Sequence, residues 1–140
     1  MVGKWNGFYT YDSQRLREFI GVEKTNFTIV VKSLENNHFT GTVEDDLLTK
    51  GTPGIGEIEG VMSIEKINFV KLMPIKAVLS FKNGMNTYPK KHKPIYYEGT
   101  FTSDKKSIEG TWKMKLGFSI FGYFVSLLSH TGTWQMHFAE

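Results

Sequence analysis

Lys71 is the residue of this chain whose surroundings in the sequence most clearly suggest chemistry. With a period of two residues, Ile67, Phe69 and Lys71 share the apolar face of a strand that runs from Ile67 to Met73. A buried ammonium group without a partner is unfavourable. Lys71 is therefore expected to meet an anionic ligand group or a Tyr or Glu neighbour. The alternative is that the strand slips or bulges near Pro74, so that Lys71 reaches water.

Three tyrosines are the next candidates, because a phenol inside an apolar wall can orient a ligand by hydrogen bonding. Tyr9, Tyr11 and Tyr97 all fall on the expected inward faces of strands. For each of them the alternative is a core tyrosine whose hydroxyl group is satisfied by the backbone.

Other chemistries have little support. The chain has no cysteine, which excludes disulfides and thiolate ligands. The carboxylates, Asp45 and Asp46 among them, are expected mostly on the solvent face, where no pair is positioned for acid–base catalysis. The histidines have no metal-ligand spacing and none is in register to face inward as a haem ligand; they are His38, His92, His130 and His137. The sequence thus predicts no metal, no cofactor and no catalytic residue.

The elements that position these side chains are strands with an inward glycine. The stretch from Ile108 to Met114 places Ile108, Gly110, Trp112 and Met114 on one face. Similar patterns centre on Gly7, Gly41, Gly60, Gly99 and Gly132. Glycine weakens a strand interior, so its recurrence there needs a reason. It lets strands coil sharply and leaves room for a large neighbouring side chain, as a small closed barrel requires.

The order of these elements predicts an all-β fold, a closed up-and-down antiparallel barrel of eight strands, or ten with the segments around Asn83. Asp12 and Ser13 precede a short predicted helix from Gln14 to Ile20, and Gly21 suits its end. A strand through Glu18 to Lys24 is the alternative. Asn83 and Gly84 predict a tight hairpin turn. The barrel strands are expected at 4–11, 25–33, 38–45, 55–63, 67–73, 95–102, 107–115 and 131–138.

The segment from Leu116 to Ser129 fits neither a strand nor a helix period. It is apolar and contains two glycines, so a helix, an extra hairpin and a lid all remain open. An exposed apolar stretch of that size usually meets a partner, so a homodimer through Leu116–Leu128 is one expectation.

Composition predicts a single domain over residues 1–140, located in the cytoplasm. The chain carries a net charge of +3, with only two arginines, Arg15 and Arg17. Its densest basic run, residues 90–93, lies between two prolines and is typical of a solvated loop. We therefore expect no nucleic-acid partner and no membrane span.

Gly3, Lys4 and Trp5 match the Gly-x-Trp opening of lipocalins and fatty-acid-binding proteins, and Gly110–Trp112 and Gly132–Trp134 resemble avidin strands. In these residues and in strand order the chain resembles the calycin superfamily. That resemblance implies a barrel that holds a ligand in its interior. It does not extend to the inward Arg-Tyr pair of fatty-acid-binding proteins, since no arginine follows Arg17.

The leading functional hypothesis is a binding protein for a small hydrophobic or amphipathic ligand. The side chains expected to line the site are Tyr9, Phe39, Phe69, Lys71, Tyr97, Trp112, Met114 and Trp134. The first alternative is a structural or interaction protein with a filled barrel, which associates with itself through residues 116–128. The second is an isomerase- or cyclase-like enzyme in which Lys71 or a tyrosine transfers a proton.

Overall fold

The structure is a computed structural model, which describes residues 1–74, 76–80, 84–88, 94–120 and 123–140. Side chains are described for residues 1–74, 94–114 and 130–140. Asn83 of the predicted hairpin turn and the basic run at 90–93 lie outside the described residues. Within the described ranges, no helix combines the length and apolar character needed to cross a bilayer.

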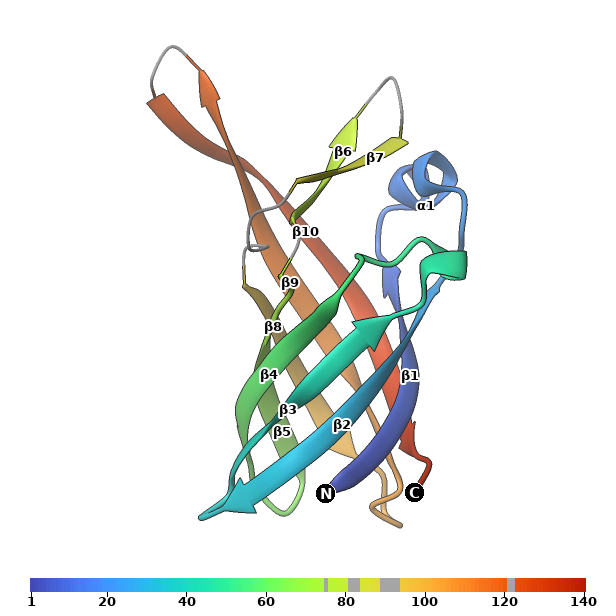
Figure 1. Cartoon of the computed structure of the whole chain (residues 1–140), viewed down its shortest axis with the longest axis vertical. Helices are drawn as coiled ribbons and strands as arrows, with labels where there is room; N and C mark the ends of the chain where they lie inside the picture. Colours follow the sequence, from blue (N-terminus) through green and yellow to red (C-terminus); the bar gives the residue numbers. More distant parts are fainter. Residues whose placement is uncertain (75, 81–83, 89–93, 121–122) are drawn as a thin grey trace.

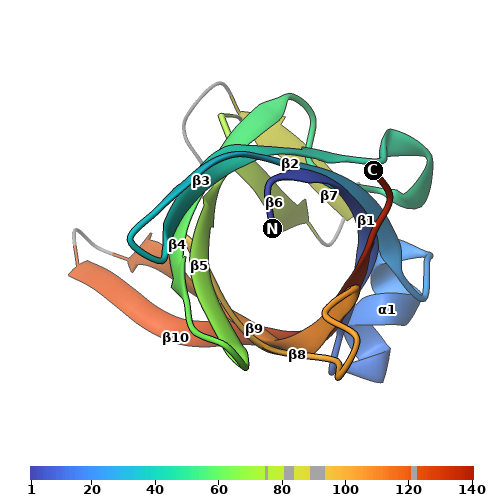
Figure 2. The same ribbon diagram turned by 90° about the horizontal axis from the view of Figure 1, so that it is seen from below.

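The chain forms a closed antiparallel barrel of eight strands in up-and-down order, as the sequence predicts (Figures 1 and 2). Each strand pairs with its neighbours along the chain, and β1 closes the ring against β10. Closure pairs every strand on both sides, which removes the free edges that promote aggregation. The strands are β1 (Gly3–Tyr11), β2 (Thr25–Glu35), β3 (His38–Asp45), β4 (Ile55–Met62), β5 (Lys66–Leu72), β8 (Ile95–Phe101), β9 (Ser107–Ile120) and β10 (Tyr123–Phe138).

Two further strands lie between β5 and β8 in the sequence but outside the barrel. They are β6 (Lys76–Ser80) and β7 (Gly84–Tyr88), which form a separate two-stranded sheet. This pair projects from the end of the barrel where β1 finishes and β2 begins, called the upper end from here on (Figure 1). The two chain termini lie together at the opposite, lower end, where Lys4 and Glu140 exchange backbone hydrogen bonds.

The helix α1 (Gln14–Ile20) has the predicted bounds and lies beside the upper end of β1 (Figure 1). The Leu16 amide donates to the Ser13 hydroxyl at 3.2 Å, which caps the first turn. Gly21 ends the helix with a φ of 93°, a left-handed conformation that favours glycine. Arg17 fixes the helix to β1, because its Nη1 donates to the Tyr11 and Asp12 carbonyl oxygens at 2.5 and 3.1 Å.

Two of the inward glycines, Gly99 and Gly132, make room for large side chains of neighbouring strands, as predicted. A Cβ atom at Gly99 would collide with the Trp134 ring, and one at Gly132 would collide with the Trp112 ring. Each tryptophan then donates its indole N–H to a strand carbonyl: Trp112 to Thr10 at 3.0 Å, and Trp134 to Thr111 at 3.0 Å. These slots are therefore filled by aromatic rings.

The lower and middle parts of the barrel form a packed core. At the lower end the side chains of Trp5, Phe39, Ile67, Ile108 and Met136 are almost completely buried. In the middle, Phe69 stacks on Tyr97 with ring centroids 4.7 Å apart, and Trp134 meets both rings edge-on at 5.5 Å. The buried polar side chains Asp45, Lys71 and His130 lie above this core, toward the upper end.

In the segment from Leu116 to Ser129, the described residues 116–120 and 123–129 continue β9 and β10 as a paired ribbon, which fits the hairpin among the three alternatives left open by the sequence. Strands β9 and β10 continue together past the barrel wall, and Tyr123 pairs with Ile120 at their far end (Figure 1). The register shifts between Val125 and Leu128. Such an irregularity breaks the two-residue alternation, which explains why the pattern in the sequence is ambiguous.

Candidate functional site

Lys71 points into the barrel, as the alternation of β5 predicts. Its side chain is only 2% exposed and lies in line with the buried residues Ile67, Phe69 and Met73. The proposed slippage near Pro74 therefore does not carry Lys71 to water. A lysine at this depth requires a partner, because a charged ammonium group loses most of its hydration on burial.

The partner of Lys71 is Asp45, the last residue of β3. Lys71 Nζ donates to Asp45 Oδ1 at 2.6 Å, and the aspartate side chain is almost as deeply buried as the lysine. The expectation that Asp45 lies on the solvent face is wrong. Phe39, Gly41, Val43 and Asp45 share the inward face of β3, and the alternation continues to the final residue of the strand.

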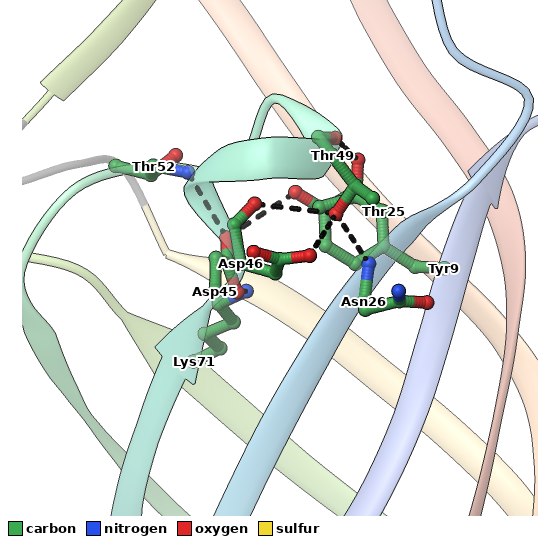
Figure 3. A network of polar contacts seen from close by, with 8 residues as sticks. All are labelled: Tyr9, Thr25, Asn26, Asp45, Asp46, Thr49, Thr52 and Lys71. Carbon is green, nitrogen blue, oxygen red and sulfur yellow. Dashed lines mark hydrogen bonds and ion pairs between the residues drawn. The ribbon is translucent and has the colours of Figure 1, made fainter.

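Two more donors complete the contacts of the Asp45 carboxylate (Figure 3). The Tyr9 hydroxyl and the Thr52 backbone amide both donate to Oδ2, each at 3.2 Å. With Lys71 on Oδ1, the carboxylate accepts three hydrogen bonds, and both of its oxygens are satisfied. This buried network of Tyr9, Asp45, Thr52 and Lys71 is called the Asp45 network below.

The loop after β3 brings Thr52 back to the carboxylate. Asp46 accepts from the Leu48 amide at 3.0 Å and so caps the short 3₁₀ helix η1 (Leu47–Thr49). Thr49 then fastens this turn to β2, because its carbonyl accepts from the Thr25 hydroxyl at 2.8 Å and its hydroxyl accepts from the Asn26 amide at 2.9 Å (Figure 3). The adjacent residues Asp45 and Asp46 thus have different roles: Asp45 pairs with Lys71 inside the barrel, and Asp46 caps the turn in the loop.

Aromatic rings surround the Asp45 network. Lys71 Nζ lies 4.9 Å from the centre of the Tyr9 ring, close enough for a cation–π contact. The Tyr9 ring stacks near Phe27 and meets Trp112 edge-on at 5.9 Å. Tyr11, two residues after Tyr9 on the same strand, packs edge-on against Trp112 with ring centroids 5.1 Å apart. The ion pair therefore lies in an apolar, low-dielectric environment, which strengthens its electrostatic interactions.

Burial changes the ionisation of the tyrosines. It raises the pKa of Tyr11 to about 12, with a further contribution from the Asp45 carboxylate. Burial and the same carboxylate also raise the pKa of Tyr9 and of Tyr97 well above the ordinary tyrosine value. All three phenols are consequently neutral at pH 7, and that of Tyr9 already donates its hydrogen bond to Asp45.

His130 is a second inward polar residue that the sequence interpretation missed. Its ring meets Tyr11 edge-on at 5.9 Å, and burial lowers the pKa of the imidazole. The expectation that no histidine faces inward is wrong, because β10 begins at Tyr123 and not at Thr131. His130 thereby falls in line with Gly132 and Trp134, which a longer strand prediction would have found.

All eight side chains expected to line a ligand site are buried, but they divide into two groups. Tyr9, Lys71, Trp112 and Met114 belong to the upper end of the barrel. The remaining four are Phe39, Phe69, Tyr97 and Trp134, which belong to the packed aromatic cluster below it. The upper group is the one that lies beside polar atoms able to orient a ligand.

A hollow of about 650 Å³ lies on the outer wall, across β10, β1, β2 and β3. Its outward side chains include Asn6, Phe8 and Gln135, and Lys24 Nζ lies 4.4 Å from the centre of the Phe8 ring. The Asn6 side-chain oxygen already accepts a hydrogen bond from the Thr28 hydroxyl at 3.1 Å. This groove is wide open and solvated, so the enclosed Asp45 network is the better candidate for specific binding.

Metal binding has no support in the part of the chain that the structure describes, where no three His, Asp or Glu side chains gather closely enough to hold an ion. Comparison of the chain with protein-family models, with curated proteins and with solved structures gives no match.

Proposed function

We propose that this protein binds a small hydrophobic or amphipathic molecule at the upper end of its barrel, beside the Asp45 network. The observation that carries the proposal is the Lys71–Asp45 pair, buried among aromatic rings. A buried ion pair contributes little to stability compared with apolar side chains of similar volume, because both ions lose their hydration. Its presence at one end of an otherwise apolar barrel therefore favours a role in recognition.

The chemistry of the site supports the same proposal. An ammonium group has three N–H donors, and among the described residues Asp45 is the hydrogen-bond partner of Lys71. Two donors are thus left on an ammonium group that lies beside the rings of Tyr9 and Phe27, and a ligand atom could accept from them. Apolar walls with a few convergent polar groups are typical of small-molecule sites. The resemblance to calycins, which we propose as a distant relationship, agrees with an interior ligand.

Native mass spectrometry of the freshly purified protein tests this proposal directly. A ligand that copurifies would add a discrete mass to the 16.0 kDa chain, and mild denaturation would release it. Tryptophan emission is the second measurement, because Trp112 borders the proposed site. If the emission stays unchanged across lipids, flavins, haem and aromatic compounds, and no mass is added, the proposal is wrong.

Self-association is a second candidate function, favoured by the hairpin that extends beyond the barrel. The pairing of β8 with β9 ends at Lys113, so among the described residues the part of β9 after Leu116 pairs only with β10. A two-stranded ribbon alone is marginally stable in water, and its sequence here is apolar. A homodimer through Leu116–Leu128 would shield the apolar ribbon from water.

Light scattering decides between a monomer and a dimer. A mass of twice 16.0 kDa, lost in the double variant Phe118→Ser/Leu127→Ser, would support association through the hairpin. A mass that stays monomeric as the protein concentration rises would contradict it. This outcome is independent of ligand binding, because the Asp45 network lies within the barrel and not on the hairpin.

A further inference from the structure

We infer that the ligand taken at the upper end is an uncharged molecule that presents a hydrogen-bond acceptor, such as a carbonyl oxygen, on an apolar body, and that carboxylates are excluded. This inference rests on the proposed binding function and specifies its ligand class. From the sequence alone the partner of Lys71 is expected to be an anionic ligand group or a Tyr or Glu neighbour, and the structure supplies Asp45 instead.

Among the side chains that the structure describes inside the upper end, the charges sum to zero. Asp45 contributes one negative charge and Lys71 contributes one positive charge, at a separation of 2.6 Å. The other described titratable groups near this pair are neutral at pH 7: the phenols of Tyr9 and Tyr11, the imidazole of His130 and, in the aromatic cluster below, the phenol of Tyr97. A bound carboxylate would therefore bring a second negative charge beside Asp45, and the described side chains offer no second cation to balance it.

Hydrogen-bonding capacity leads to the same ligand class. The Asp45 carboxylate accepts from Lys71, Tyr9 and the Thr52 amide, so it is well satisfied without a ligand. Within the described part of the chain Lys71 donates to Asp45 alone, which leaves two further N–H donors beside the rings of Tyr9 and Phe27. A neutral acceptor satisfies those donors without adding charge, and an apolar body suits the aromatic walls.

Matched pairs of compounds test the inference, because each pair keeps the apolar body constant. Methyl naphthyl ketone is compared with naphthoate, and methyl tridecyl ketone with tetradecanoate, by tryptophan emission and by native mass spectrometry at pH 7. Naphthamide is added as a neutral relative of naphthoate with nearly the same shape. We expect each ketone, and the amide, to bind about tenfold or more tightly than the matching carboxylate.

The variant Asp45→Asn gives the sharper test, because it leaves Lys71 as an unbalanced cation. Its preference should reverse, so that naphthoate binds more tightly than the ketone. The matched control is Glu44→Gln, which removes one negative charge from the adjacent residue on the outer face of β3. The control should keep the preference of the wild-type protein.

The outcomes distinguish the inferred ligand class from the proposed binding function. Carboxylates that bind the wild-type protein as tightly as their neutral partners would overturn the inference while leaving the proposed function intact. Failure of every probe to bind, together with no copurifying mass, would reject both. If Asp45→Asn does not fold, as judged by its circular dichroism, the comparison of naphthamide with naphthoate on the wild-type protein still decides the question.

Discussion

Lys71 Nζ and Asp45 Oδ1 lie 2.6 Å apart although their strands, β5 and β3, are separated in the barrel by β4. The contact therefore reaches across a whole strand inside the barrel, and the two side chains meet where the apolar filling ends. Because both groups are almost fully buried, each depends on the other for its charge balance. This mutual dependence can be measured by substituting each residue alone and both together.

Removing one member of the pair should be far more harmful than removing both. Lys71→Met leaves the Asp45 carboxylate buried without its cation, so we expect a loss of about 3–5 kcal/mol in the free energy of unfolding. The double variant Lys71→Met/Asp45→Asn should recover most of that loss, since neither charge remains. Urea denaturation of the wild-type protein, Lys71→Met, Asp45→Asn and the double variant measures the coupling free energy between the two side chains. Additive effects of the two substitutions would contradict the paired arrangement.

The alternation of strand residues was sufficient to predict the barrel and one half of this pair. The repeated inward glycine marked six of the eight barrel strands, and apolar alternation located β2 and β5, which contain no glycine. The alignment of Lys71 with Ile67 and Phe69 correctly predicted an inward lysine. The same rule, applied to Phe39 and Val43, would have placed Asp45 inside. Asp45 was missed because it was read together with Asp46 as a pair of solvated acids.

Other parts of the site could not be predicted from strand patterns. Thr52 reaches the carboxylate through its backbone amide, at the end of a loop whose path is set by the turn at Asp46 and Thr49. No side-chain pattern encodes such a contact. That Lys71 and Asp45 meet across β4 depends on the curvature of the closed ring, which periodicity along one strand does not report.

Acid should destabilise the protein partly through His130. Burial lowers the pKa of its imidazole in the folded state below the ordinary value of 6.5, so the unfolded chain binds more protons once the pH falls below that value. The free energy of unfolding is therefore expected to decrease as the pH drops from about 7 to about 5. His130→Gln should reduce this decrease, as measured by urea denaturation at several pH values. His137→Gln, on the outer face, is the control; equal pH slopes in the wild type and in His130→Gln would refute the prediction.

Alkaline titration should show tyrosines that ionise late. Burial and the Asp45 carboxylate hold the pKa of Tyr11 at about 12, and they raise those of Tyr9 and Tyr97 as well. Because these folded-state values exceed the ordinary value of 10.0, stability is expected to fall as the pH rises above 10. Tyrosinate absorbance, followed while circular dichroism confirms the fold, measures the titration. Tyr11→Phe should remove a step near pH 12, and a wild-type curve complete by about pH 11 would contradict this assignment.

The slot at Gly132 should be intolerant of even one methyl group. A Cβ atom there would collide with the Thr10 carbonyl oxygen and with the Trp112 indole nitrogen, which are themselves joined by a hydrogen bond of 3.0 Å. Gly132→Ala must therefore displace the ring or the strand, and we expect it to cost about 1–3 kcal/mol in the free energy of unfolding and to shift tryptophan emission. Gly21→Ala is the comparison, because a Cβ atom there meets nothing within 4 Å and only the left-handed backbone resists it. That variant should cost about 1 kcal/mol and leave the emission unchanged. Equal emission spectra for Gly132→Ala and the wild-type protein would show that Trp112 does not occupy the slot.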